Sequence, residues 1–281
     1  MEETTNSTST AKRYAVVTGA NKGIGLEICR QLASNGIAVI LTARDEKKGV
    51  EAIDNLKVSG LSDMFFHQLD VNNAGILGLT TDHEAYRDYR QGGGIVSDED
   101  AHLLDKLMKQ TYEMTQECLK TNYYGTKGVT EALLPLLQLS NSARIVNVSS
   151  VNGQLSFINN EKVKEELQNV DSLTEEKIDK ILLWFLMDFK EYKLQANGWP
   201  LIVSAYKVSK AAINAYTKLV ARKFPDFRVN CVHPGYVKTD MNDNTGNLTP
   251  EEGARAPVML ALLPDNGPSG SYYDEMHASI F

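Results

Sequence analysis

The sequence predicts an α/β fold in which the strands of a parallel sheet alternate with helices. Short apolar runs at residues 15–18, 37–42 and 144–148 have the length and composition of strands that are buried on both faces of such a sheet. After the first run, apolar residues recur at helical spacing over residues 26–32. Short strands that alternate with helices indicate βαβ units.

A glycine-rich turn lies between the first predicted strand and the first predicted helix. It reads Thr-Gly-Ala-Asn-Lys-Gly-Ile-Gly over residues 18–25. Glycine permits close approaches that a side chain would block, and a helix N-terminus presents free N–H groups and a partial positive charge. Such a turn suits a pyrophosphate group, although a glycine cluster taken alone can also be an ordinary loop.

Composition excludes several classes of function. The chain has 281 residues, of which 42% are hydrophobic and 23% charged, and a net charge of −7, with no Lys/Arg-rich block for nucleic acid. The most apolar run, residues 181–187, is shorter than the ~20 residues that span a membrane. The three cysteines are scattered and form no C-x-x-C pair, which predicts a reducing, cytoplasmic location. The five histidines do not have the spacing of metal ligands, so no metal site is predicted.

The sequence predicts one domain, with a disordered N-terminal tail and a helical insertion. Residues 1–12 are rich in Thr, Ser and Glu and predict a disordered tail, and residues 13–281 contain no linker. A charged, helix-favouring stretch predicts a helical insertion at about residues 151–205. Residues 76–100 are polar and contain glycine, so we expect a mobile loop there and a long helix from about Asp100.

The end of the second strand bears on the choice of dinucleotide. It reads Ala43-Arg44-Asp45. In a dinucleotide fold an acidic residue here binds the ribose of NAD, whereas an arginine accommodates the extra phosphate of NADP. Lys22 supplies a second cation and favours NADP(H). The alternative is that Arg44 is a solvated residue and Asp45 the N-cap of the next helix.

Six ordered motifs resemble those of the short-chain dehydrogenase/reductase family. They are the turn at residues 18–25, Asn-Asn-Ala-Gly at residues 72–75, Asn122, Ser150, Tyr206 with Lys210, and Pro234-Gly235 with Thr239. The long gap before Tyr206, with its Gly198-Trp-Pro, is most similar to monomeric carbonyl reductases and plant salutaridine and menthone reductases. The resemblance implies a doubly wound parallel sheet (Rossmann-like) with helices on both faces, forming one dinucleotide-binding reductase domain.

The resemblance also implies a reaction, the NADPH-dependent reduction of a ketone or aldehyde to an alcohol on a small hydrophobic, terpenoid- or alkaloid-like substrate. Tyr206 and Lys210 are four residues apart and share one helix face. Tyr206 would protonate the carbonyl oxygen, while Lys210 and the oxidised nicotinamide would stabilise its phenolate. Ser150 would polarise the carbonyl, with Ser149 as the alternative donor. Asn122 would hold a water that links Lys210 to solvent.

Cofactor contacts and oligomeric state follow from the same resemblance. We expect a monomer, because the insertion would cover the surface through which family oligomers pack. The partner is then a small carbonyl compound. The implied cofactor-binding residues are Thr18, Gly19, Asn21, Lys22, Gly23, Ile24, Gly25, Arg44, Asp70, Val71, Asn73, Ala74, Gly75, Tyr206, Lys210, Pro234, Gly235, Val237 and Thr239.

One junction departs from the family pattern. Asp70-Val71, which ends the third strand, runs directly into the Asn-Asn-Ala-Gly motif that follows the fourth strand in the family. A parallel crossover takes a dozen or more residues, so the sequence predicts the loss of one central strand. Residues 64–71 must then stay in the third position of the sheet or move to the fourth, and the motif geometry favours the move.

Two alternatives remain open at this stage. The same residues would serve an NADP-dependent alcohol dehydrogenase that works in the oxidative direction. Because the sheet lacks a strand, the chain could also be a catalytically impaired member that only binds the cofactor. The substrate is not specified, since pocket walls come from variable loops.

Overall fold

The computed structural model describes residues 12–69, 75–91 and 98–281. The chain divides into two compact units, residues 1–70 and 71–281, and each is described by itself. The predicted tail, apart from its last residue, lies outside the described residues, as do four of the predicted cofactor contacts, Asp70, Val71, Asn73 and Ala74. Within the described ranges, no helix is long and apolar enough to cross a bilayer.

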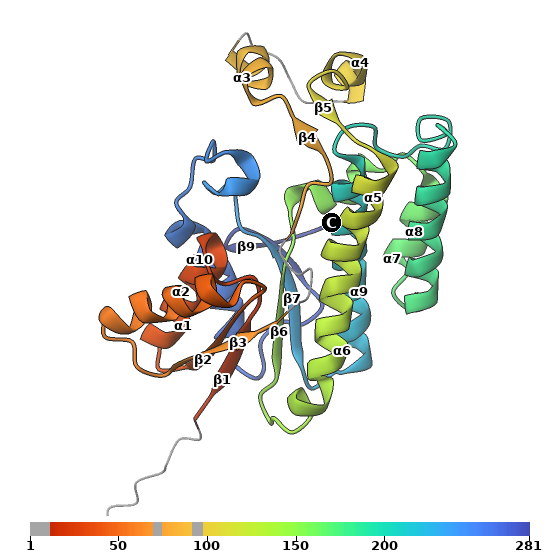
Figure 1. The fold of residues 1–281 in the computed structure, drawn as a ribbon. Helices are drawn as coiled ribbons and strands as arrows, with labels where there is room; N and C mark the ends of the chain where they lie inside the picture. The colour runs from red at the N-terminus through yellow and green to blue at the C-terminus, as the bar shows by residue number, and fades with distance from the viewer. Residues whose placement is uncertain (1–11, 70–74, 92–97) are drawn as a thin grey trace, which may run out of the picture. The chain divides into compact units, whose positions relative to one another are not determined.

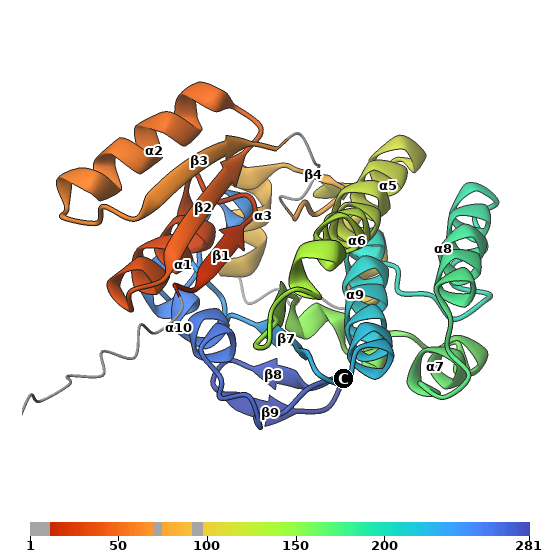
Figure 2. The same ribbon diagram turned by 90° about the horizontal axis from the view of Figure 1, so that it is seen from below.

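The first unit is a three-stranded parallel sheet with two helices (Figure 2). Its elements are β1 (Tyr14–Val17), α1 (Gly23–Ser34), β2 (Ala38–Ala43), α2 (Glu46–Val58) and β3 (Met64–Gln68). β3 pairs with β2, from Met64 opposite Val39 to Gln68 opposite Ala43. The predicted move of this strand to the fourth position is therefore wrong, because its partner is the second strand.

The second unit contains a four-stranded sheet in the order β6-β7-β8-β9. Its strands are β6 (Arg144–Val148), β7 (Arg228–His233), β8 (Tyr272–Asp274) and β9 (His277–Ser279), of which only β9 runs antiparallel to its neighbour. In Figure 1, α6 (Gly125–Leu137) and α9 (Ser204–Lys223) lie on one side of β6 and β7, and α10 (Pro250–Ala261) lies on the other. This arrangement confirms the α/β fold with a parallel sheet and helices on both faces.

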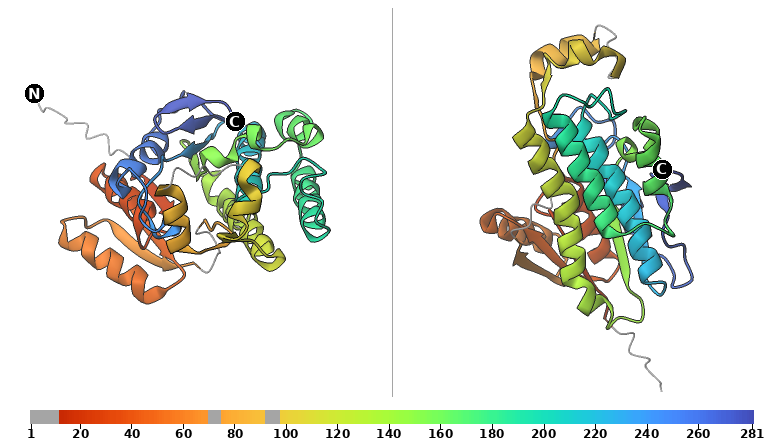
Figure 3. Two further views of the ribbon diagram at one scale, coloured as in Figure 1. Left: turned by 90° about the horizontal axis from the view of Figure 1, so that it is seen from above. Right: turned by 90° about the vertical axis from the view of Figure 1, so that its right-hand side faces the viewer.

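The stretch between Ser150 and Tyr206 forms two helices, α7 (Glu161–Gln168) and α8 (Glu175–Lys190). Figure 3 shows α8 beside α9 and α5 (Tyr112–Leu119). The buried face of α8 consists mainly of apolar residues, among them Ile178, Leu182 and Phe185. The helical insertion thus extends the apolar core around α9.

The chain before α5 does not form the mobile loop and the long helix that the sequence predicted. A small arm contains β4 (Thr80–Thr81), α3 (His83–Gln91), α4 (Ala101–Leu104) and β5 (Met108–Lys109), with β4 and β5 antiparallel (Figures 1 and 3). The expectation of one helix from Asp100 is wrong, because α4 ends at Leu104 and α5 begins after Thr111. The Thr111 hydroxyl accepts a hydrogen bond from the backbone N–H of Met114 at 3.2 Å, which fixes this helix start.

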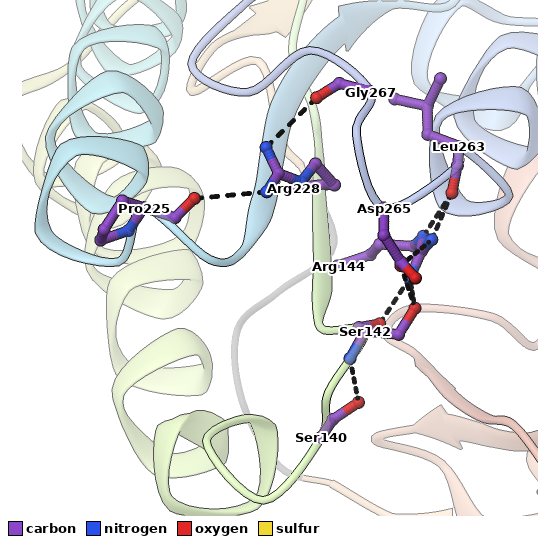
Figure 4. A network of polar contacts seen from close by, with 8 residues as sticks. All are labelled: Ser140, Ser142, Arg144, Pro225, Arg228, Leu263, Asp265 and Gly267. Carbon is purple, nitrogen blue, oxygen red and sulfur yellow. Dashed lines mark hydrogen bonds and ion pairs between the residues drawn. The ribbon is translucent and has the colours of Figure 1, made fainter.

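Two arginines anchor the ends of β6 and β7 that lie opposite the Ser150 and Pro234 ends (Figure 4). Arg144 donates from Nε to the carbonyl of Leu263 at 2.8 Å and pairs with Asp265 at 3.0 Å. Arg228 donates to the carbonyls of Gly267 and Pro225 at 3.2 and 3.3 Å. These bonds satisfy the carbonyls of the neighbouring loops and hold these loops against the first residues of β6 and β7.

The strands that would flank a fourth strand are both edges. In the described part of the chain, β1 pairs only with β2, and β6 pairs only with β7. Tyr14 and Val16 of β1 are 65% and 39% exposed, and Val148 of β6 is 36% exposed. Each of these two strands is thus an edge of its own sheet in the described part of the chain and carries apolar side chains that contact water.

Candidate active site

Helix α9 brings the predicted tyrosine and lysine together. Tyr206 and Lys210 are both buried, and Lys210 Nζ lies 5.5 Å from the centroid of the Tyr206 ring. Lys210 Nζ also donates a hydrogen bond of 2.9 Å to the backbone carbonyl of Val148, the last residue of β6. The carboxyl end of the strand thus fixes the ammonium group beside the phenol.

The two serines after β6 have different partners. Ser150 lies near Tyr206, where it acts to lower the pKa of the phenol, and its Oγ accepts from the backbone N–H of Asn152 at 3.2 Å. Ser149 Oγ donates to Asn214 Oδ1 at 2.5 Å in the buried core. The geometry therefore favours Ser150 over Ser149 as the residue that faces a substrate.

Replacement of each serine by alanine should separate these roles. Ser150→Ala is expected to lower turnover by roughly 10²- to 10³-fold, the typical cost of removing one donor to a reacting oxygen. Ser149→Ala is expected to leave turnover largely intact and to cost about 1–3 kcal/mol of stability, because Asn214 loses a buried partner. Steady-state kinetics and thermal melts of both variants test this, and the opposite pattern would make Ser149 the donor.

Asn122 lies in a π-helical turn (Lys120–Tyr124) between α5 and α6. Its Oδ1 accepts from the backbone N–H of Ile76, and its Nδ2 donates to the Ile76 carbonyl and to Ser209 Oγ, each at 2.9 Å. These bonds use the hydrogens of the amide and fix the backbone at Ile76. That Asn122 also holds a water linking Lys210 to solvent stays a prediction.

Gly75, the last residue of the Asn-Asn-Ala-Gly motif, lies at the same place. A Cβ atom on Gly75 would be 3.6 Å from Lys210 Nζ, 3.8 Å from Asn122 Oδ1 and 3.5 Å from Met241 Cε. The shortened junction therefore does not separate the end of this motif from Lys210. The sequence motifs did not single out Met241, which lies near Gly75, or Ser209, which binds Asn122. Ser209 could have been found because it lies between Tyr206 and Lys210 in the sequence.

Burial is the main influence on the ionisation of Tyr206 and Lys210. It raises the pKa of Tyr206 to about 12, against the opposing effect of the hydrogen bond with Ser150. It lowers the pKa of Lys210 to about 8. At neutral pH the site thus holds a neutral phenol beside a mostly protonated amine. The expected stabilisation of the phenolate involves the oxidised nicotinamide as well as Lys210, and it stays a prediction for the cofactor-bound protein.

The glycine turn of the first unit has the backbone of an anion cradle. Gly19 and Gly23 have φ values of 61° and 57°, and a Cβ on Gly25 would lie 2.7 Å from the Gly19 carbonyl oxygen. Lys22 is the N-cap of α1 and its side chain makes no capping hydrogen bond. An ammonium group cannot accept hydrogen bonds, so a lysine at this position leaves the first N–H groups of α1 without a side-chain acceptor and adds a positive charge, which suits a phosphate group. The other predicted contacts in this turn, Thr18, Asn21 and Ile24, belong to the same segment.

Asp45 is the N-cap of α2. Its carboxylate accepts from the backbone N–H of Lys48 at 3.1 Å. Arg44, which follows β2 directly, is exposed. The Asp45 carboxylate thus caps α2, as the alternative interpretation expected. Arg44 is the residue at this strand end whose charge suits a phosphate.

The Pro-Gly segment after β7 makes mainly structural contacts. Gly235 has a φ of 87°, and Val237 is buried against Gly253 of α10. The Thr239 side chain caps the short turn Asp240–Asn242, and its backbone N–H donates to Asn242 Oδ1 at 3.1 Å. This turn carries Met241, which connects the segment to Gly75.

Two family descriptions match the chain. A short chain dehydrogenase family matches residues 13–88, and an enoyl-(acyl carrier protein) reductase family matches residues 193–262. Salutaridine reductase from Papaver somniferum is 48% identical over the whole of both chains. The chain belongs to the short-chain dehydrogenase/reductase family. It is thus an oxidoreductase by family, as the ordered motifs predicted.

Further relatives agree with this family. A (+)-neomenthol dehydrogenase from Arabidopsis thaliana is 49% identical, over 96% of this chain and 98% of the relative. Carbonyl reductase [NADPH] 3 from Rattus norvegicus is 38% identical, over 91% and 93%. The solved salutaridine reductase from Papaver somniferum superposes with a TM-score of 0.84 at 48% identity, covering 94% of this chain and all of that one. The solved menthone neomenthol reductase from Mentha piperita superposes with a TM-score of 0.80 at 41% identity, covering 95% of this chain and all of that one.

The alignment with salutaridine reductase is longer than this chain. It runs over 311 positions, whereas this chain has 281 residues, so about 30 positions of the relative have no counterpart here. A segment of that length is enough for one crossover helix and one strand.

Proposed function

We propose that this short-chain dehydrogenase/reductase reduces the carbonyl group of a small hydrophobic ketone or aldehyde with NADPH. The observation that carries the proposal is the buried arrangement of Ser150, Tyr206 and Lys210, in which Lys210 Nζ lies 5.5 Å from the centroid of the Tyr206 ring and is held by the Val148 carbonyl. The relatives named for salutaridine, menthone and neomenthol support a terpenoid- or alkaloid-like substrate.

Each residue has a defined part in this reaction. Bound NADPH would supply the hydride that reduces the carbonyl carbon. Tyr206 donates its proton to the carbonyl oxygen as negative charge develops there, and Ser150 donates a hydrogen bond to the same oxygen. Lys210 contributes a positive charge beside the phenol, held in place by the Val148 carbonyl. Asn122 binds the backbone of Ile76 and so holds Gly75 close to the Lys210 ammonium.

We propose NADPH as the cofactor because a cation, Arg44, follows β2 while Asp45 caps α2. The name of the rat carbonyl reductase agrees with this choice. Arg44→Asp should replace attraction for the 2′-phosphate by repulsion and cost about 2–3 kcal/mol of binding free energy. Isothermal titration with NADPH measures this. Lys47→Asp, an equal charge reversal on α2, is the control, and an unchanged affinity of Arg44→Asp would place the phosphate elsewhere.

Two alternatives are distinguished by experiment. An enzyme that works in the oxidative direction would turn over an alcohol with NADP at neutral pH faster than it reduces the ketone. A catalytically impaired family member would show a thermal shift with NADPH but no consumption of NADPH with any carbonyl compound. The neutral state of Tyr206 favours reduction, because a protonated phenol is the form that donates a proton.

We infer a monomer in which residues 13–281 act as a single dinucleotide-binding domain, and we propose a cytoplasmic location because all three cysteines are buried free thiols. Support for the monomer comes from α7 and α8, which cover the α5 and α9 side of the second unit. Light scattering at micromolar concentration is expected to give one chain per particle. A stable tetramer would show that these helices leave the family interface open.

A further inference from the structure

The backbone that leads into α9 is strained immediately before the predicted catalytic tyrosine. Val203 has φ 53° and ψ 35°, the left-handed conformation. A β-branched residue in this conformation is unfavourable and persists only where its surroundings impose it. Tyr206 follows three residues later, so whatever holds Val203 also sets the start of the helix that carries the phenol.

Two side chains of the arm hold this backbone from one side. Asp98 accepts hydrogen bonds from the backbone N–H groups of Leu201 and Ile202, each at 3.0 Å. Gln110 accepts from the backbone N–H and the hydroxyl of Ser204 at 2.8 and 2.9 Å, and its Nε2 donates to the Leu201 carbonyl at 2.9 Å. The polar groups on both sides of Val203 are thus bound by residues about a hundred positions earlier in the chain.

Asp98 also reaches the first turn of α9. Its carboxylate lies 3.5 Å from Nζ of Lys207, the residue next to Tyr206. The Lys207 side chain is mostly buried and its Nζ lies 5.0 Å from the centroid of the Phe157 ring, in the segment that follows Ser150. The contact of Asp98 therefore connects the arm, α9 and the segment after Ser150.

The insertion holds the other end of the same lead-in. The Trp199 indole Nε1 donates to Asp188 of α8 at 2.7 Å, and the ring is buried against Phe185. Residues 199–204 are thus fixed at Trp199 by α8 and at Leu201, Ile202 and Ser204 by the arm. A backbone held at both ends in this way can keep Val203 in its strained conformation.

We propose that Asp98 and Gln110 are positioning residues, which hold the lead-in to α9 and thereby set the Tyr206 hydroxyl against Ser150. The proposal rests on the proposed function only for its kinetic consequence. Proton donation depends on placement within a fraction of an ångström, and a shift of ~1 Å can cost about 10²-fold in rate.

The test uses Asp98→Ala and Gln110→Leu in the full chain. Gln110→Glu keeps an oxygen acceptor for Ser204 and is the conservative variant, and Glu99→Ala removes a neighbouring exposed carboxylate as the control. We expect hydrogen exchange at the amides of residues 201–204 to accelerate at least tenfold in the first two variants. We also expect kcat to fall about 10- to 100-fold with an unchanged KM for NADPH. Glu99→Ala should stay close to the parent chain, and Gln110→Glu, which keeps the acceptor for Ser204 but loses the donor to the Leu201 carbonyl, should lie between the parent chain and Gln110→Leu.

A second substitution tests the role of the strain. Glycine adopts the conformation of Val203 without strain, so Val203→Gly should restore part of the kcat lost in Asp98→Ala. Unchanged exchange at residues 201–204 would overturn the proposal, whether or not the chain turns over. Faster exchange with an unchanged kcat would also overturn it. A parent chain without carbonyl turnover, but with exchange that depends on Asp98, would refute the proposed function and leave the fixed lead-in established.

Discussion

Tyr206→Phe is expected to lower carbonyl turnover by about 10²- to 10⁴-fold, the usual contribution of a positioned proton donor. The ring remains, so the packing beside Lys210 is preserved, whereas the hydroxyl proposed to protonate the carbonyl oxygen is lost. NADPH affinity should stay within a few fold, because the phosphate-binding turn is a separate segment of the chain. Single-turnover kinetics and a binding titration on the same preparation measure the two quantities.

A matched control is available on the same helix. Tyr216 is also buried in α9, with its ring 6.0 Å from that of Tyr123 in an edge-to-face contact. Tyr216→Phe should change stability slightly and leave turnover near that of the parent chain. Equal turnover in Tyr206→Phe and Tyr216→Phe would remove Tyr206 from the reaction.

A chain repaired at the shortened junction is expected to be clearly more stable. The repair inserts a family-like crossover helix and strand after Val71, about as long as the roughly 30 positions of salutaridine reductase that have no counterpart in this chain. The new strand would give β1 and β6 a partner on their open edges and cover side chains such as Val16, which is 39% exposed. Burial of a whole apolar side chain contributes about 1.5–3 kcal/mol, so covering the exposed part of each such side chain adds roughly 1 kcal/mol, and three of them about 3 kcal/mol.

The size of the expected shift follows from the same contributions. A gain of about 3 kcal/mol corresponds to roughly 6–12 °C in Tm for a chain of this size, with a rise in carbonyl turnover as the sheet closes. A Gly/Ser linker of equal length at the same junction is the control, since it adds chain without a strand. If the repaired chain melts and turns over like the parent, the missing segment is dispensable.

The strands and the residues around Tyr206 could be predicted because their signals are local. Apolar runs specify buried strands, and the spacing of Tyr206 and Lys210 places both on one face of a helix. The position of β3 could not be predicted in this way, because strand pairing is a long-range contact and the motif after Val71 pointed to a different neighbour. Strand β3 instead keeps its register with β2, from Met64 to Gln68.

The arm and the partners of Asn122 were outside the reach of sequence patterns for a related reason. Helix α3 is short and strongly polar, and its apolar face is formed mainly by Tyr86 and Tyr89, a weak signal against a polar loop. Asn122 could be recognised from its motif, but its bonds to Ile76 and Ser209 join segments that are 46 and 87 residues apart. The same holds for Asp98, whose partners lie more than a hundred residues away.

The central claim is that this chain transfers a hydride from NADPH to a carbonyl carbon at the site formed by Ser150, Tyr206 and Lys210. The most direct measurement incubates the purified chain with NADPH deuterated at C4 and a panel of cyclic terpenoid and alkaloid ketones, and analyses the products by mass spectrometry. The account predicts an alcohol that carries deuterium on the former carbonyl carbon, formed by the parent chain and not by Tyr206→Phe. Saturating NADPH binding without any labelled alcohol, or equal labelling by both chains, would contradict it.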